Sequence, residues 1–261
     1  MSHPLKIAQI SDTHLFSDKR ALHCGADVYQ NLVNVLSHIK LVEQPDVIVF
    51  TGDLTQDHSD ASYQLFVDII QQLKIIIPVH FIPGNHDEVQ QLEHYLMGAP
   101  FDPSKIISND FWQLLLINSK GDTPSGYVSN EALQWINEHI DPNKKQLVMM
   151  HHHPINVGYG IDKHGLKNKD VFWNSIKQHS SIQALACGHV HNDLTLKPED
   201  TGYPFPLFTC PATSIQFDQT ATTSACNGQG AGYRIFELFD DKKLITRTHF
   251  IASQSEATID E

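Results

Sequence analysis

The 261-residue sequence has few cysteines, no long apolar run and few basic residues. Its four cysteines form no CxxC pair, which argues against a zinc–thiolate site or a disulfide framework. Apolar runs such as Val47–Phe50 are far too short to cross a bilayer, so we expect no membrane partner. The first residues, Met1–Lys6, lack the apolar region of a signal peptide, and we therefore expect a cytoplasmic protein.

Acidic residues outnumber basic ones, 30 against 18, and the formal net charge is −12. Such a surface repels nucleic acid and anionic lipid, so we expect no nucleic-acid partner. The apolar stretches are also too short to predict a subunit interface. Histidine, by contrast, is abundant at 17 residues, and it is the commonest metal ligand in proteins. The composition therefore raises the question of a metal site.

Periodicity predicts alternating strands and helices in the first part of the chain and mostly strands near its end. The order indicates an α/β fold, a sandwich of two sheets covered by helices, in one domain over residues 1–252 with a flexible tail over 253–261. The expected strands are Leu5–Ile10, Val47–Thr51, His80–Ile82, Trp112–Ile117, Gln146–Met150, Gln183–Cys187, Leu207–Thr209, Thr213–Phe217, Tyr233–Leu238 and Leu244–Phe250. The expected helices are Asp27–Val42, Ala61–Leu73, Asn130–His139 and Asp170–Gln178, with caps at Ser59 or Asp60 and at Ser129.

Residues suited to metal binding follow five of the expected strands. They are Asp12 and His14, then Asp53, then Asn85-His86-Asp87, then His151-His152-His153, and finally His189 and His191. In open α/β sheets the ligand crevice lies outside the carboxyl ends of the strands, so these five segments are expected to meet in one pocket. Taken alone, a segment of this kind can be a surface turn or a solvated strand end, but five of them in order favour a metal site.

The residue types suit a site for two cations. A carboxylate such as Asp53 can bridge two ions about 3.5–4 Å apart, as two-metal hydrolases require. Asn85 adds a neutral oxygen, which avoids excess negative charge beside an anionic substrate. Carboxylates, imidazoles and an amide without thiolates favour Mn²⁺, Fe²⁺ or Zn²⁺. The neighbouring glycines, Gly52, Gly84 and Gly188, are expected to let the backbone turn sharply below the ions.

Together the five segments resemble the pattern of the calcineurin-like metallophosphoesterases: Asp-x-His, Gly-Asp, Gly-Asn-His-Asp, His and Gly-His-x-His. The resemblance implies a four-layer α/β/β/α sandwich with two mixed sheets and two divalent metal ions per chain. It also implies metal ligands at Asp12, His14, Asp53, Asn85, His152, His189 and His191, with His151 and His153 as alternatives to His152. The same resemblance places His14, Asn85, His86 and His191 against the substrate phosphate, and His86 in catalysis. For Asp87 two interpretations stay open, a partner that orients His86 or an exposed turn residue.

A closer resemblance links several segments to the bacterial class III cyclic-AMP phosphodiesterases. The segments are Ile10–Phe16, Thr51–Asp57, Asp162–Asn168, Pro211–Phe217 and Gly232–Arg234. The resemblance implies hydrolysis of 3′,5′-cyclic AMP to 5′-AMP by attack of a metal-activated hydroxide. Two alternatives stay open. One is an enzyme for 2′,3′-cyclic nucleotides, glycerophosphodiesters or phosphomonoesters, and the other is a scaffold that binds without turnover.

Three later features carry further expectations. Residues 156–168 follow the histidine run directly and are expected to form a wall of the pocket. Asn168, His164 and Asn118 are available to a base or ribose, and Tyr159 or Phe217 is available to stack. Arg234 is expected to pair with an acidic neighbour. Residues 199–206 form an unusually long connection that would affect nucleotide preference if it overhung the site.

Overall fold

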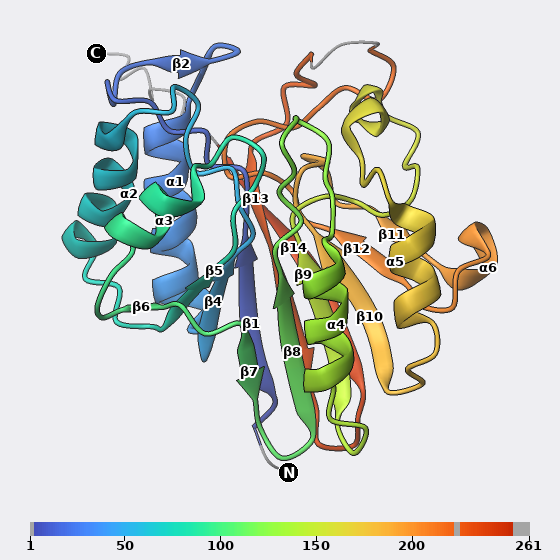
Figure 1. Cartoon of the computed structure of the whole chain (residues 1–261). Coiled ribbons are helices and arrows are strands. Elements are labelled where there is room, and N and C mark those ends of the chain that lie inside the picture. Colours follow the sequence, from blue (N-terminus) through green and yellow to red (C-terminus); the bar gives the residue numbers. More distant parts are fainter. Residues whose placement is uncertain (1–2, 222–224, 253–261) are drawn as a thin grey trace.

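The computed structural model describes residues 3–221 and 225–252 and forms four layers, with two sheets inside and helices outside (Figure 1). The expected tail over 253–261 falls outside the described residues. In the first sheet the strands lie in the order β14 (Leu244–Ile251), β13 (Ala231–Leu238), β1 (Leu5–Ile10), β4 (Val47–Phe50), β5 (Val79–Phe81) and β6 (Phe101–Asp102). In the second the order is β11 (Thr195–Leu196), β12 (Leu207–Thr209), β10 (Ile182–Cys187), β9 (Lys145–Met150), β8 (Trp112–Ile117) and β7 (Ile106–Ser108).

Both sheets are mixed. In the first, β1, β4, β5 and β6 are parallel, whereas β13 and β14 pair antiparallel at one edge. In the second, β8, β9, β10 and β12 are parallel, whereas β7 and β11 pair antiparallel at the two edges. The parallel strands of each sheet therefore end at a common edge, the arrangement that a shared ligand site needs.

Helices cover the outer face of each sheet. The first sheet is covered by α1 (Val28–His38), which continues as a π-helical turn over Ile39–Glu43, by α2 (Asp60–Gln72) and by α3 (Val89–Tyr95). The second is covered by α4 (Asn130–His139) and α5 (Lys169–Ile176), and smaller elements are β2 (Leu22–His23), β3 (Ala26–Asp27), a 3₁₀ turn at Gly160–His164 and α6 (Pro198–Thr201). None of the helices in the described part of the chain is long and apolar enough to cross a membrane.

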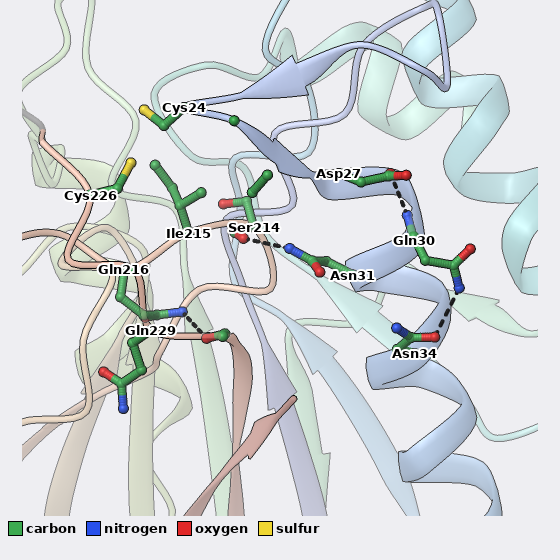
Figure 2. Close-up of a pocket in the computed structure, with 14 residues that line it drawn as sticks. Cys24, Asp27, Gln30, Asn31, Asn34, Ser214, Ile215, Gln216, Cys226 and Gln229 are labelled. Carbon is green, nitrogen blue, oxygen red and sulfur yellow. Dashed lines mark hydrogen bonds between the residues drawn. The ribbon is translucent and has the colours of Figure 1, made fainter. Parts of the chain in front are cut away.

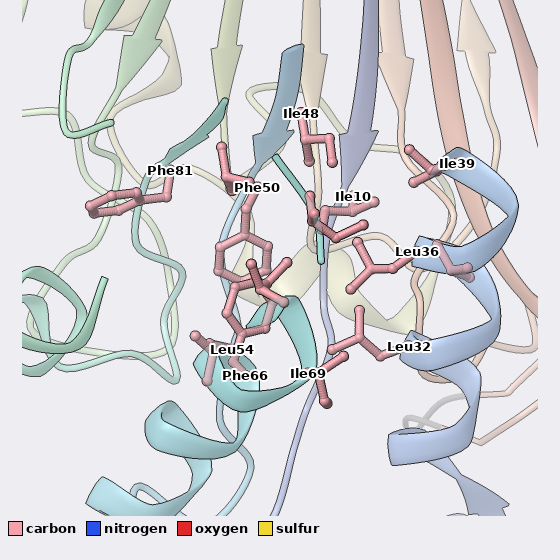
Figure 3. Packing of buried hydrophobic residues seen from close by; sticks show 14 of the residues in the cluster. Ile10, Leu32, Leu36, Ile39, Ile48, Phe50, Leu54, Phe66, Ile69 and Phe81 are labelled. Carbon is pink, nitrogen blue, oxygen red and sulfur yellow. The ribbon is translucent and has the colours of Figure 1, made fainter. Parts of the chain in front are cut away.

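Alternation along the buried strands explains the layers. On β4, Val49 packs between the two sheets. Ile48 and Phe50 pack against the helices (Figure 3). The Phe50 ring lies 5.3 Å from that of Phe66 on α2. Truncating such a buried phenylalanine to alanine costs about 3–5 kcal/mol. Apolar layers on both sides of each sheet confirm the expected α/β/β/α sandwich.

Serine caps fix two of the helices where the sequence predicted them. Ser59 accepts a hydrogen bond from the backbone N–H of Ser62, and Ser129 accepts one from Ala132. Each cap satisfies a free N–H of the first turn, worth about 1 kcal/mol. The bounds of α4 and β8 agree with the prediction to the residue.

One expected strand, Thr213–Phe217, is wrong. Its polar groups bind neighbouring loops instead of a strand: the Thr213 N–H donates to Ser11 and the Ser214 hydroxyl to the carbonyl of Asp12. Its β-branched residues are buried by these loops, which produced a strand-like pattern. Sequence analysis missed the β2–β3 hairpin, β6, β7, β11, α3 and α6, because they are short and carry little periodicity.

Candidate metal centre

The loops after β1 and β4 bring the first candidate ligands together. The backbone N–H of Asp12 donates to the carbonyl of Gly52 at 2.8 Å, and that of His14 donates to the carbonyl of Asp53 at 3.1 Å. The first sheet thus continues as loop-to-loop hydrogen bonds past its strand ends. Asp12, His14 and Asp53 are all buried as a result.

Five candidate ligands have left-handed backbone conformations, which non-glycine residues avoid. The φ angles are 57° at Asp12, 46° at His14, 58° at Asp53, 66° at His189 and 51° at His191. Such conformations cost on the order of 1–3 kcal/mol each and gather where function requires them. The surrounding hydrogen bonds stabilise them: both carboxylate oxygens of Asp12, for example, accept from the backbone N–H of His189.

The first cluster joins Asp12, His14 and His191. The Nε2 atom of His191 lies 3.3 Å from Oδ1 of Asp12 and 3.2 Å from Nε2 of His14. On its other side, His191 donates from Nδ1 to the carbonyl of Ile215 at 2.8 Å. That bond leaves the Nε2 lone pair directed at the other two candidate ligands.

The second cluster joins Asp53, Asn85 and His151. His151 donates from Nδ1 to the carbonyl of Thr51 at 2.7 Å, and its Nε2 lies 3.4 Å from Oδ2 of Asp53 and 3.2 Å from Oδ1 of Asn85. Burial alone lowers the pKa of His151, but the carboxylates of Asp53 and Asp12 outweigh it and raise the pKa to about 9. The environment thus favours a positive charge at this nitrogen.

Both clusters fit divalent cations. In each, a histidine donates to a backbone carbonyl with one nitrogen and turns the other toward carboxylate or amide oxygens, which favour a positive charge at that point. A carbonyl behind the imidazole is the usual support of a metal-binding histidine. His189 follows the pattern, because its Nε2 donates to the carbonyl of His164 at 3.1 Å. The aspartate and histidine cluster is therefore compatible with a dinuclear metal site.

His152 differs from His151 in its partners. Its Nδ1 lies 2.9 Å from the Ser119 hydroxyl, and its Nε2 lies 3.3 Å from the carbonyl of Pro124. Both nitrogens are thus engaged away from Asp53, although the ring lies within reach of His151 and His189. Of the three consecutive histidines, the geometry favours His151 at the metal position. His153 pairs with Asp162 at 3.1 Å.

His86 lies at the edge of the centre, where its backbone N–H donates to Oδ1 of Asp53 at 2.8 Å. Its ring meets the His14 ring edge-on and stacks on that of His58. Burial lowers the pKa of His86 despite the nearby Asp53 carboxylate, which favours the neutral form of the ring. A neutral ring in this position offers one N–H to a bound ligand.

Asp87 is neither exposed nor in contact with the His86 ring through any hydrogen bond of the described residues. It is fully buried, and its carboxylate accepts from the backbone N–H groups of Asp53, Leu54 and Gly84. Both expectations for Asp87 are therefore wrong. The reason is that its loop packs directly under the loop of Asp53, so the carboxylate joins the two loops.

The expected glycines are needed mostly for close packing. Gly52 does turn, with φ of 99°, and it lies against the backbone of Gly84. A Cβ atom at Gly84 would collide with the Asp53 side chain, and one at Gly188 would collide with the Ser11 hydroxyl. Side chains at these positions would push Asp53 and Asp12 out of place.

A cavity of about 310 Å³ opens over the centre. Besides candidate ligands it is lined by His23, Gln56, His86, Pro124, Ile161, His164 and Phe217. The expected wall over 156–168 thus contributes Ile161 and His164, and the expected Phe217 also lines the cavity, whereas Asn118 and Tyr159 do not. Asn168 instead bonds to the backbone of Val128 through its side chain. Sequence analysis did not predict His23 as a cavity residue, because Gly25 is the main turn signal in its hairpin.

The structure also bears on the expectations for Arg234 and for residues 199–206. Arg234 is buried and donates to the carbonyls of Thr209 and Leu194, so the prediction of an acidic partner is wrong. The connection over 199–206 contains α6, joins two strands at the edge of the second sheet and does not line the cavity.

Comparison with known sequences points to one family. The model of the calcineurin-like phosphoesterases matches residues 5–193. The chain is 48% identical over 250 residues to a probable cyclic nucleotide phosphodiesterase of Colwellia psychrerythraea, covering 94% of both. It is 32% identical over 254 residues to the 3′,5′-cyclic adenosine monophosphate phosphodiesterase CpdA of Escherichia coli, covering 95% of this chain and 90% of that protein.

Solved structures share the fold at low sequence identity. A dimetal phosphatase from Danio rerio superposes with a TM-score of 0.63 at 12% identity, covering 95% of this chain and 97% of that one. The purple acid phosphatase PPD1 from yellow lupin gives a TM-score of 0.60 at 13% identity, covering 96% of this chain and 52% of that one.

Proposed function

Because the chain belongs to the calcineurin-like phosphoesterase family, a family of hydrolases, we propose that it hydrolyses 3′,5′-cyclic AMP to 5′-AMP. The observation that supports this substrate is the similarity, over nearly the whole chain, to proteins named for this activity. The Escherichia coli protein, for example, is 32% identical. Hydrolysis would lower the level of a second messenger, and a cytoplasmic location follows from that role. We take residues 1–252 as one phosphoesterase domain.

The ligand set we propose divides between two ions. Asp12, His14 and His191 hold the first, and Asn85, His151 and His189 hold the second, with Asp53 between them. His151 replaces His152 because its free nitrogen faces Asp53 and Asn85. The oxygen and nitrogen donors favour Mn²⁺ or Fe²⁺, with Zn²⁺ also suited. Bound there, the ions would neutralise charge on the phosphate and lower the pKa of water so that hydroxide is present near neutral pH.

The remaining residues bind and orient the substrate. Burial favours the neutral form of the His86 ring, which lies beside His14, so its N–H can donate to a phosphoryl or leaving oxygen. His14, Asn85 and His191 also face the cavity, next to where the phosphate would lie.

The nucleoside is proposed to occupy the rest of the cavity. Phe217 stacks on His191 with ring centres 4.0 Å apart, and Ile161 adds apolar surface for a base. His23 offers a ring nitrogen on the same wall. A cavity of about 310 Å³ falls in the range of small-ligand sites.

A substrate panel tests the proposal. Purified protein is stripped with a chelator, reloaded with Mn²⁺ or Fe²⁺, and given 3′,5′-cyclic AMP, 2′,3′-cyclic AMP and a phosphomonoester in parallel. We expect preference for 3′,5′-cyclic AMP, with 5′-AMP as product. Turnover of the other esters alone would reassign the substrate, and no turnover with any ion would indicate a binding scaffold.

A further inference from the structure

Two of the four cysteines lie side by side, although they are far apart in the sequence. Cys24 occupies the turn of the β2–β3 hairpin, and Cys226 lies on the segment that follows Phe217 (Figure 2). Both line one cavity of about 620 Å³, and their side chains lie next to each other on its wall (Figure 2). Tertiary structure alone explains this proximity.

The other two cysteines differ in accessibility. Cys187 and Cys210 are fully buried, and burial raises the pKa of each thiol, which makes both inert. Cys24 is exposed and Cys226 partly exposed, so a small oxidant in solution can reach this pair.

The cysteine pair also joins two walls of the catalytic cavity. Cys24 follows His23, which lines that cavity, and the buried Nδ1 of His23 has no hydrogen-bond partner. Cys226 forms an isolated β-bridge with Phe217, which stacks on the candidate ligand His191. A bond between the sulfur atoms would therefore connect the His23 wall to the Phe217 wall.

We propose that Cys24 and Cys226 form a reversible disulfide, made by exchange with a low-molecular-weight disulfide, that restrains both walls of the catalytic cavity. The Cys24 thiolate attacks one sulfur of the small disulfide and releases the first small thiolate. The Cys226 thiolate then attacks the Cys24 sulfur and releases the second. Two electrons pass from the protein to the small disulfide, and the two thiol protons pass to the released thiolates.

The order of attack follows from the environment of each thiol. Partial burial, followed by the hydrogen bond and charge of Cys24, raises the pKa of Cys226 to about 12. Cys24 is exposed and attacks first. Once its sulfur is in a mixed disulfide, the contribution of Cys24 to the pKa of Cys226 is removed, which favours the second step.

The test uses the full chain in glutathione buffers of increasing oxidised fraction. Free thiols are trapped with N-ethylmaleimide and peptides are mapped by mass spectrometry without reduction. We expect loss of two alkylatable thiols, one peptide linking Cys24 to Cys226 within a single chain, and reversal by dithiothreitol. Hydrogen–deuterium exchange should slow in residues 22–27 and 225–228 upon oxidation.

Two single variants serve as matched controls. Cys24→Ser should lose the linked peptide and keep Cys226 alkylatable, and Cys226→Ser should stop at the glutathione adduct on Cys24. A stable glutathione adduct on Cys24 in the wild-type chain, a crosslink between chains, or unchanged exchange in both segments would overturn the proposal. These readouts do not depend on which phosphoester the enzyme hydrolyses.

Discussion

Oδ2 of Asp87 accepts a hydrogen bond from the backbone N–H of Asp53 at 2.8 Å, directly beneath the candidate metal centre. The same carboxylate accepts from Leu54 and Gly84, so one buried side chain holds both loops. Asp53 is the residue proposed to contact both ions, and its φ of 58° requires support. We therefore propose that Asp87 is a positioning residue, which would support the metal site through Asp53.

Asp87→Asn is expected to weaken metal binding by about 10–100-fold, the usual effect of losing such a supporting partner. The amide has one acceptor oxygen for three N–H groups. The measurement is metal content against free Mn²⁺ concentration. The control Asp241→Asn alters an exposed turn aspartate that also accepts a backbone N–H, from Lys243. Equal metal affinity in the two variants would contradict the role of Asp87.

His151→Ala is expected to lose one metal equivalent per chain, whereas His152→Ala should retain two. The reason is that Nε2 of His151 faces Asp53 and Asn85, while both nitrogens of His152 contact Ser119 and Pro124. Metal analysis of the purified variants measures this directly, and a thermal melt checks that each is folded. The opposite pattern would return the ligand position to His152.

His86→Ala is expected to keep both metals and to lower the rate by about 10²–10⁴-fold, the usual range for a group that stabilises the transition state. His58→Ala is a matched control, because His58 stacks on the His86 ring from outside the cavity lining. Loss of bound metal in His86→Ala would make His86 a ligand instead.

His23→Leu is expected to raise KM for the cyclic nucleotide by about 2–10-fold, the effect of one lost hydrogen bond. Bis(4-nitrophenyl) phosphate has no ribose or base, so its KM should not change. Leu22→Ala is the control, since Leu22 is an exposed neighbour on the same strand. Equal changes for both substrates would mean that His23 supports the site without contacting the nucleoside.

Acid stability depends in part on Asp57, which accepts hydrogen bonds from Ser17 and Ser59. Partial burial raises its pKa, but these bonds outweigh burial and lower it from 3.8 to about 2. Because the pKa of Asp57 is lower in the folded than in the unfolded chain, its carboxylate stabilises the fold at pH values above the unfolded pKa. This contribution is lost as pH falls from about 4 to 2.

The contribution of Asp57 is on the order of 1 kcal/mol, because the side chain is largely exposed and solvent screens it. The free energy of unfolding, measured by denaturant titration, should therefore fall less between pH 6 and pH 3 in Asp57→Asn than in wild type. Asp68→Asn, on the exposed face of α2, should behave like wild type. An unchanged pH dependence in Asp57→Asn would rule out this contribution.

The sequence was sufficient to predict the layers and the edge at which the site forms, because apolar strands and the residues after them are local signals. The choice among His151, His152 and His153 was not predictable in this way. It depends on the carbonyl of Thr51, which follows β4 of the first sheet, whereas the histidines follow β9 of the second. Thr51 and His151 are 100 residues apart in the chain. Asp87 likewise required knowing that the loops of Gly52 and Gly84 pack against each other.

The most direct test of the account is the rate of 3′,5′-cyclic AMP hydrolysis as Mn²⁺ is added back to metal-free protein. Two equivalents per chain should be needed for full rate, and 5′-AMP should be the product. Full rate at one equivalent would contradict a dinuclear centre. Binding of two equivalents without turnover of 3′,5′-cyclic AMP would contradict the proposed substrate.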